Sequence, residues 1–184
     1  MKTQKRLLKK VGQFFCLAVL AIGIQSCDTD IPLEDREPPK FSFQITGDGF
    51  NHIFNQDTDF DNIQLNLRKD ATYTFTISGG DTGGLRSLRW TIKGNDQIVL
   101  QDPIISPWVF RNSILMDVIQ WYGDPANPVS GSFLTGNMKV AGDLGANLFR
   151  FTLSDYGGES GRSNYFFADL KISIGNHTTE IISL

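Results

Sequence analysis

Carboxylates recur at every second position in one short stretch of the chain. Asp57, Asp59 and Asp61 alternate with other residues, as the first ligands of calcium loops do, and clustered carboxylates suit a hard cation such as Ca²⁺. The helix-loop-helix calcium motif is absent, because Asn62 occupies the position of its required glycine. The sequence predicts either a loop-type calcium site at these aspartates, aided by Asp48, or a solvated loop. We expect no other cofactor.

A second group combines aromatic and polar side chains beside two prolines: Trp121, Tyr122, Asp124 and Asn127. An aromatic ring can stack on a sugar ring while nearby polar groups bond the sugar hydroxyls. The alternative is that these rings close one end of a hydrophobic core. The group therefore predicts either a glycan-binding cluster or a core cap.

Catalytic chemistry finds little support in the residues. His52 and His177 are the only histidines and lie far apart in the chain, with no spacing suited to zinc. The segment Gly158-Glu159-Ser160-Gly161-Arg162 lacks the final glycine of a nucleophile elbow. No pair of glutamates is placed for glycoside hydrolysis, and nothing singles out a pair of loop aspartates. We expect a protein without catalytic residues rather than an enzyme.

The first 26 residues have the plan of a secretory signal. Basic residues open the chain, and an apolar run of fourteen residues follows from Val11 to Ile24. This run is shorter than the roughly 20 residues that a membrane-spanning helix needs, so the pattern favours a removable signal over a permanent anchor.

The tetrapeptide Ile24-Gln25-Ser26-Cys27 resembles the lipobox of bacterial lipoproteins. In that family the cysteine thiol receives a diacylglyceryl group and the peptide before it is cleaved. The resemblance implies that residues 1–26 are removed and that membrane lipid is a partner through acylated Cys27. It implies a lipid anchor in the cell envelope, at the surface or periplasmic face of the outer membrane, or alternatively at the periplasmic face of the inner membrane.

The chain after the signal is acidic, with 12 Lys and Arg against 20 Asp and Glu. Nucleic-acid binding needs basic patches, so we expect no nucleic-acid partner.

Residues 27–40 are charged and rich in proline, which predicts a flexible tether. Residues 41–184 then form one domain. The chain has two cysteines: Cys16 lies inside the signal and Cys27 is the predicted site of acylation. No disulfide is therefore expected in the domain.

From Phe41 onward, apolar residues alternate with polar ones, as in half-buried strands. Glycine-rich turns separate these rows, and no helical periodicity is interleaved with them. The pattern predicts an all-β, antiparallel β-sandwich. The strong rows are Phe41/Phe43/Ile45, Ile63/Leu65/Leu67, Tyr73/Phe75/Ile77, Leu88/Trp90/Ile92, Phe149/Phe151/Leu153 and Ala168/Leu170/Ile172/Ile174.

Two stretches, Phe75–Gly84 and Phe151–Gly158, each run from a strand into an Asp-x-Gly-Gly turn. We interpret them as two strands that end at the same pole of one sandwich. With Trp90 on the strand between them, this arrangement resembles immunoglobulin-like domains of bacterial surface proteins. The resemblance implies an immunoglobulin-like sandwich with Trp90 buried on a central strand.

The segment from Ile104 to Val129 interrupts the alternation and is the predicted functional insert. Within it, residues 113–122 fit a short helix capped by Ser113, or a strand. Taken together, the sequence predicts a membrane-anchored binding module for a glycan or a surface partner. The alternatives are a structural or assembly subunit of an envelope complex or adhesin, and, more remotely, a hydrolase.

Overall fold

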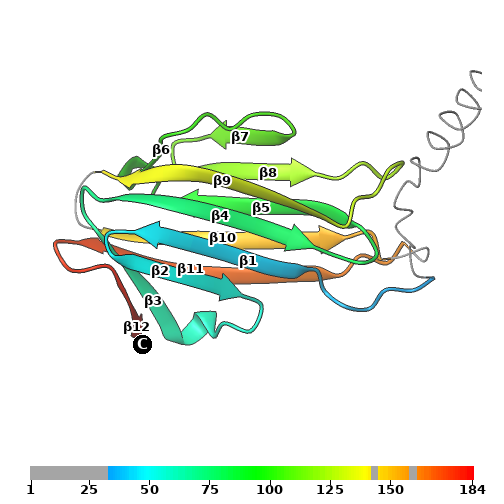
Figure 1. The fold of residues 1–184 in the computed structure, drawn as a ribbon, viewed down its shortest axis with the longest axis horizontal. Coiled ribbons are helices and arrows are strands. Elements are labelled where there is room, and N and C mark those ends of the chain that lie inside the picture. The colour runs from blue at the N-terminus through cyan, green and yellow to red at the C-terminus, as the bar shows by residue number, and fades with distance from the viewer. Residues whose placement is uncertain (1–32, 142–144, 158–160) are drawn as a thin grey trace, which may run out of the picture.

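The computed structural model describes residues 33–141, 145–157 and 161–184. The predicted signal and Cys27 lie outside the described residues. The described chain forms two β-sheets stacked face to face, and this sandwich confirms the predicted fold class (Figure 1). Within the described residues, no helix has the length and apolar character needed to cross a membrane.

One sheet has five strands and faces the viewer in Figure 1. Its strands, in spatial order, are β2 (Phe50–Asn55), β1 (Lys40–Gly47), β4 (Thr72–Gly80), β9 (Gly131–Val140) and β6 (Ile98–Leu100).

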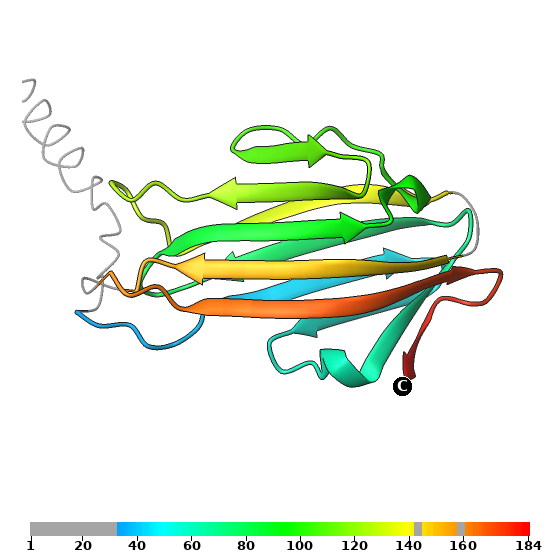
Figure 2. The same cartoon turned by 180° about the vertical axis from the view of Figure 1, so that it is seen from behind.

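The other sheet has seven strands and faces the viewer in Figure 2. Its strands, in spatial order, are β12 (Glu180–Ser183), β3 (Ile63–Arg68), β11 (Tyr165–Gly175), β10 (Gly145–Asp155), β5 (Leu85–Lys93), β8 (Met116–Tyr122) and β7 (Trp108–Asn112). Two single-turn 3-10 helices complete the described elements, η1 (Phe60–Asn62) and η2 (Asn95–Gln97).

The described strands pair antiparallel with one exception. Strand β3 runs parallel to β11, with Leu65 opposite Ile172. A purely antiparallel sandwich was predicted, and this pair departs from it because β3 and β11 are far apart in the chain and meet without a hairpin between them.

All six predicted rows of alternating residues form strands, and their apolar members point into the sandwich. In β4, for example, Tyr73, Phe75 and Ile77 are buried while Thr72 and Thr74 are exposed. Period-two alternation produces this result because successive side chains of a strand point to opposite faces.

Aromatic rings fill the centre of the core. Trp90 is fully buried, as predicted, with its ring 4.8 Å from that of Phe75 and 5.1 Å from that of Phe149. Both contacts are edge-to-face, a favourable geometry for aromatic pairs. Its indole N–H has no hydrogen-bond partner within the described residues, so this side chain contributes packing rather than polar bonding.

The predicted insert is a β-hairpin rather than a helix. Strands β7 and β8 pair antiparallel and extend the seven-stranded sheet at its edge. Ser113 lies in the turn between them, where its hydroxyl donates to the Met116 carbonyl at 2.8 Å. Val118 and Ile119 are both buried although adjacent, and this adjacency gave residues 113–122 their helix-like pattern.

The sandwich has two ends, which we name by the chain segments they carry. The tether pole is the end where β1 begins and β4 and β10 end; the far pole is the end with the β1–β2 and β7–β8 turns. The predicted tether does not stay flexible up to residue 40, because Asp35 and Pro39 are buried against the tether pole. Its last residues are therefore part of the folded domain.

Candidate functional site

The structure does not gather Asp57, Asp59 and Asp61 into a ligand group. All three are exposed, and Asp59 accepts a hydrogen bond from Asn62 at 2.9 Å. Within the described residues, they form no group of acidic side chains close enough to share an ion. The exposed side chains fit the solvated-loop alternative, because alternation along a loop does not by itself make the side chains converge.

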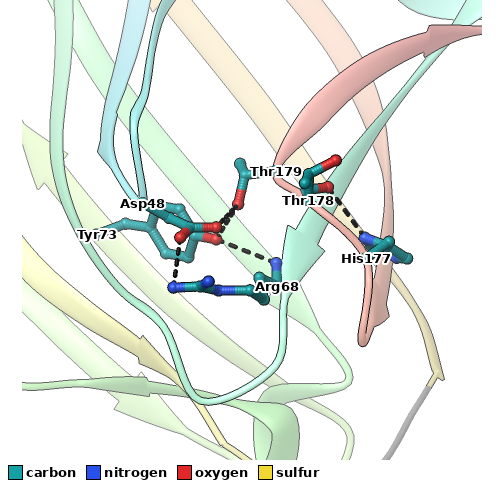
Figure 3. Close-up of polar contacts among 6 residues, drawn as sticks. All are labelled: Asp48, Arg68, Tyr73, His177, Thr178 and Thr179. Atoms are coloured by element: carbon teal, nitrogen blue, oxygen red, sulfur yellow. Dashed lines mark hydrogen bonds and ion pairs between the residues drawn. The ribbon is translucent and has the colours of Figure 1, made fainter.

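Asp48, the further ligand considered for that loop, lies at the far pole in a different network (Figure 3). The Arg68 backbone N–H donates to the Tyr73 hydroxyl at 3.0 Å, and the Thr179 hydroxyl donates to Asp48 at 2.7 Å. The Tyr73 and Thr179 hydroxyls are 2.5 Å apart, and this contact connects the Arg68 backbone to the Asp48 carboxylate. Arg68 also forms an ion pair with Asp48, so this carboxylate is engaged in holding the far pole together.

The predicted glycan cluster is divided by the fold. Trp121 is only 6% exposed and belongs to the core, which favours the core-cap interpretation for this ring. Tyr122 points outward and is exposed. Asp124 accepts hydrogen bonds from the Asn127 side chain and the Ala126 backbone, and these bonds hold its pKa below the ordinary value. The polar groups of the cluster therefore bond one another.

The other end of the insert carries an exposed apolar surface. Fourteen large hydrophobic side chains are exposed in the part of the chain that the structure describes, and five of them lie between residues 105 and 115. Val99 on the neighbouring β6 adds a sixth. We call this surface the apolar edge; it consists of Val99, Ile105, Val109, Phe110, Ile114 and Leu115.

The apolar edge lies where both sheets end on the same side of the sandwich. Strand β6 is the last strand of one sheet and β7 the last of the other, and Figure 1 shows both along the same margin. A pocket of about 350 Å³ lies between them, lined by Val99, Ile104 and Phe110 among others. A side chain of a partner could enter here.

The backbone of β7 is also available for pairing. Its inner side bonds β8, and no described strand pairs with its outer side. Natural edge strands are commonly protected by lysine, proline or a bulge. Strand β7 contains neither lysine nor proline, and Arg111 is its single charged residue. The edge can thus offer main-chain hydrogen bonds together with apolar contacts.

Three carboxylates meet at the tether pole, and sequence reasoning missed this cluster. Asp81 follows β4, Asp155 ends β10, and Asp35 comes from the segment before β1; one oxygen of each lies within 4.8 Å of the others. The two Asp-x-Gly-Gly turns were correctly predicted to share a pole, and that repeat was the available signal for two of the three residues.

The electrostatics of this cluster are most visible at Asp81. The pKa of Asp81 is raised from 3.8 to about 7. Burial is the largest cause; the negative charges of Asp35 and Asp155 and a hydrogen bond with Asp35 act in the same direction, and the Gly83 N–H acts against them. An ionised carboxylate is disfavoured there because it would lie near two others in a partly dehydrated site.

The raised pKa of Asp81 predicts that stability falls as pH rises. Between about pH 4 and pH 7 the native Asp81 keeps a proton that the unfolded chain has lost, so the folded state is favoured at the low end and loses this advantage toward pH 7. Urea unfolding with a chelator present should show wild type losing stability relative to Asp81→Asn across this window. A constant difference between the two proteins would contradict the prediction.

Comparisons with known proteins place few constraints on function. No protein-family model matches the chain, and no curated protein matches it. Among solved structures, the chain is similar to a cohesin module from a family 33 glycoside hydrolase of Clostridium perfringens ATCC13124. The TM-score is 0.35 and the identity 9%, over 62% of this chain and 97% of the module. A likeness at this level does not bear on binding or activity.

Proposed function

We propose that the protein is a lipoprotein of the outer membrane, held there by acylated Cys27, and that it binds a protein partner at the apolar edge. The observation that carries the proposal is the concentration of exposed hydrophobic side chains on and beside the open strand β7. Exposed apolar patches of this kind mark interaction surfaces in soluble domains. A protein partner suits both the binding and the assembly roles expected from the sequence.

A protein surface fits this edge better than a glycan does. Ile114 is 98% exposed and Leu115 74% exposed, and neither side chain can bond a sugar hydroxyl. The ring best suited to stacking on a sugar, Trp121, is buried. Apolar contacts and strand pairing are instead the means by which protein segments recognise an open sheet edge.

The position of the hairpin tip supports the proposal. Ile114 and Leu115 lie at the far pole, while Asp35 lies at the tether pole. Asp35 lies only eight positions after Cys27, a stretch that spans at most about 29 Å when extended. An anchor at Cys27 would therefore place the tether pole toward the membrane and leave the hairpin tip directed away from it.

Charge at the hairpin tip is expected to abolish partner binding. Burial of Ile114 and Leu115 should contribute about 1.5–3 kcal/mol each, so the double variant Ile114→Glu/Leu115→Glu should bind the partner at least about 100-fold more weakly. The wild-type protein, solubilised in detergent, is used to capture its partner from native envelopes, and the captured protein is then titrated against each variant.

A matched control is offered by Ile53→Glu. Ile53 is 54% exposed on β2, the edge strand at the other side of the five-stranded sheet, so its replacement should leave the affinity unchanged. Equal affinities of the tip variant and wild type would refute the assignment of the apolar edge, as would the failure of wild type to capture any partner.

A further inference from the structure

We propose that the tether pole contains a calcium site in which Asp35, Asp81 and Asp155 are the carboxylate ligands. The three residues come from three separate segments of the chain, and the fold brings their oxygens within 4.8 Å of one another. Two oxygens bound to one Ca²⁺ lie at most about 4.6–5.2 Å apart, twice the metal–oxygen distance, so the separations are close to those that one shared ion requires.

One oxygen of the cluster is buried without a partner. Asp35 is 8% exposed; its Oδ1 accepts the Glu37 N–H at 3.0 Å, whereas its Oδ2 has no hydrogen-bond partner within the described residues. A buried carboxylate oxygen left unbonded is costly, and such atoms in native proteins call for an explanation. A proton shared with Asp81 is one means of satisfying this oxygen, and a bound cation is the other.

The unpaired oxygen lies beside the turn that carries Asp81. A methyl group built on Gly83 would lie 2.6 Å from Asp35 Oδ2 and 3.2 Å from Asp81 Oδ1, so both oxygens lie against the same glycine. The Gly83 N–H donates to Asp81 Oδ1 at 2.7 Å and fixes that carboxylate. The first Asp-x-Gly-Gly turn therefore leaves room for two carboxylates to approach each other.

Asn164 fixes the third ligand. Asp155 is fully buried, and both of its oxygens accept hydrogen bonds from Asn164, at 2.6 Å from the backbone and 2.8 Å from the side chain. The Asn164 side chain also donates to the Asp35 carbonyl at 3.0 Å. Each carboxylate oxygen has a second lone pair, so these bonds orient Asp155 and still allow it to bind an ion.

Arg36 pairs with Glu34 rather than with the three carboxylates. Arg162 lines the same pocket as Asp35. All the offered ligands are oxygens, which excludes a preference for soft metals. Ca²⁺ accepts irregular sets of six to eight oxygens, with water and backbone carbonyls completing them, whereas Mg²⁺ requires a near-ideal octahedron. Ligands from three unrelated segments suit Ca²⁺.

The site would lock the end of the tether onto the sandwich. Asp35 is the ligand that precedes β1, and Arg36 next to it is well exposed. Bound calcium holds Asp35 in place and so should protect the Arg36–Glu37 bond from trypsin. At a calcium concentration 100 times the Kd, the population of undocked tether should fall about 100-fold.

Calorimetric titration of the full-length protein in detergent with calcium chloride tests the site. Wild type should bind one ion, and magnesium chloride should bind more weakly. Asp35→Asn, Asp81→Asn and Asp155→Asn should each weaken binding at least about tenfold, because each removes a charged ligand at unchanged size. The triple variant Asp57→Asn/Asp59→Asn/Asp61→Asn is the control and should bind as wild type does.

Asp35→Asn is the decisive variant because Asp35 precedes the first strand and its replacement leaves every strand intact; circular dichroism confirms its fold. The inference fails if wild type releases no heat with calcium, if Asp35→Asn binds calcium as wild type does, or if the control variant loses binding. It also fails if calcium does not slow cleavage at Arg36, or if magnesium binds as tightly as calcium.

Discussion

Replacing Cys27 with alanine is expected to abolish incorporation of radiolabelled palmitate into the protein. The resemblance to the lipoprotein signal makes the Cys27 thiol the acceptor of the acyl chains, and removal of residues 1–26 accompanies that modification. The variant should therefore also keep its leader and migrate as a larger protein on a gel. Two acyl chains, at about 0.8 kcal/mol per buried methylene, are enough to account for stable anchoring of the wild type.

The matched control is Cys16→Ala. Cys16 is the only other cysteine of the chain and lies within the predicted signal, so its loss should leave palmitate labelling and processing unchanged. Palmitate incorporation that persists in Cys27→Ala would remove the basis for the proposed anchor.

Replacing Trp90 with alanine is expected to lower the free energy of unfolding by about 3–5 kcal/mol, since it leaves a large cavity in the core. Trp90 is fully buried and contacts Phe43, Phe75 and Phe149. Domains of this size are stable by only about 5–15 kcal/mol, so the variant loses much of its stability. Urea unfolding followed by circular dichroism measures the loss.

Trp90→Phe separates packing from polar effects at the same position. The indole N–H is buried without a partner within the described residues, and its removal relieves a desolvation cost that offsets part of the lost contact area. We expect Trp90→Phe to cost less than half of what Trp90→Ala costs. Equal losses in the two variants would contradict this expectation, because a phenylalanine ring fills much of the space that alanine leaves empty.

The sequence predicted those strands whose two faces differ in environment. β1, β4, β10 and β11 bury alternate residues along most of their length, and the period of two identifies them. β3 and β5 keep the alternation in residue type, although Asn66 and Thr91 between their apolar residues are buried as well. Which strands pair could not be derived, because the parallel contact between β3 and β11 depends on residues about a hundred positions apart.

The insert shows where alternation fails. Asp117, Val118 and Ile119 are consecutive and all buried, so β8 is covered on both faces and its pattern fits a helix as well as a strand. The sequence predicts a functional insert here because the segment interrupts the alternation. The apolar edge was not predicted, because exposure of Ile114 and Leu115 depends on their position in the β7–β8 turn.

The carboxylates at the tether pole show a second reason why the sequence could not predict the site. Composition marked Asp35 as part of a solvated linker, since charged and proline-rich segments rarely bury side chains. The structure buries Asp35 beside Asp81 and Asp155, residues 46 and 120 positions further along the chain. The repeated turn indicated that two aspartates share a pole, but convergence of the third is a property of the folded chain alone.

Photo-crosslinking in intact membranes tests the apolar edge most directly. A photoreactive phenylalanine analogue is placed at position 114 or, as a control, at position 53, both exposed on edge elements at different sides of the sandwich. We predict a covalent adduct with one different protein from position 114 and none from position 53. Equal labelling from both positions, or an adduct of two copies of this chain, would contradict the account.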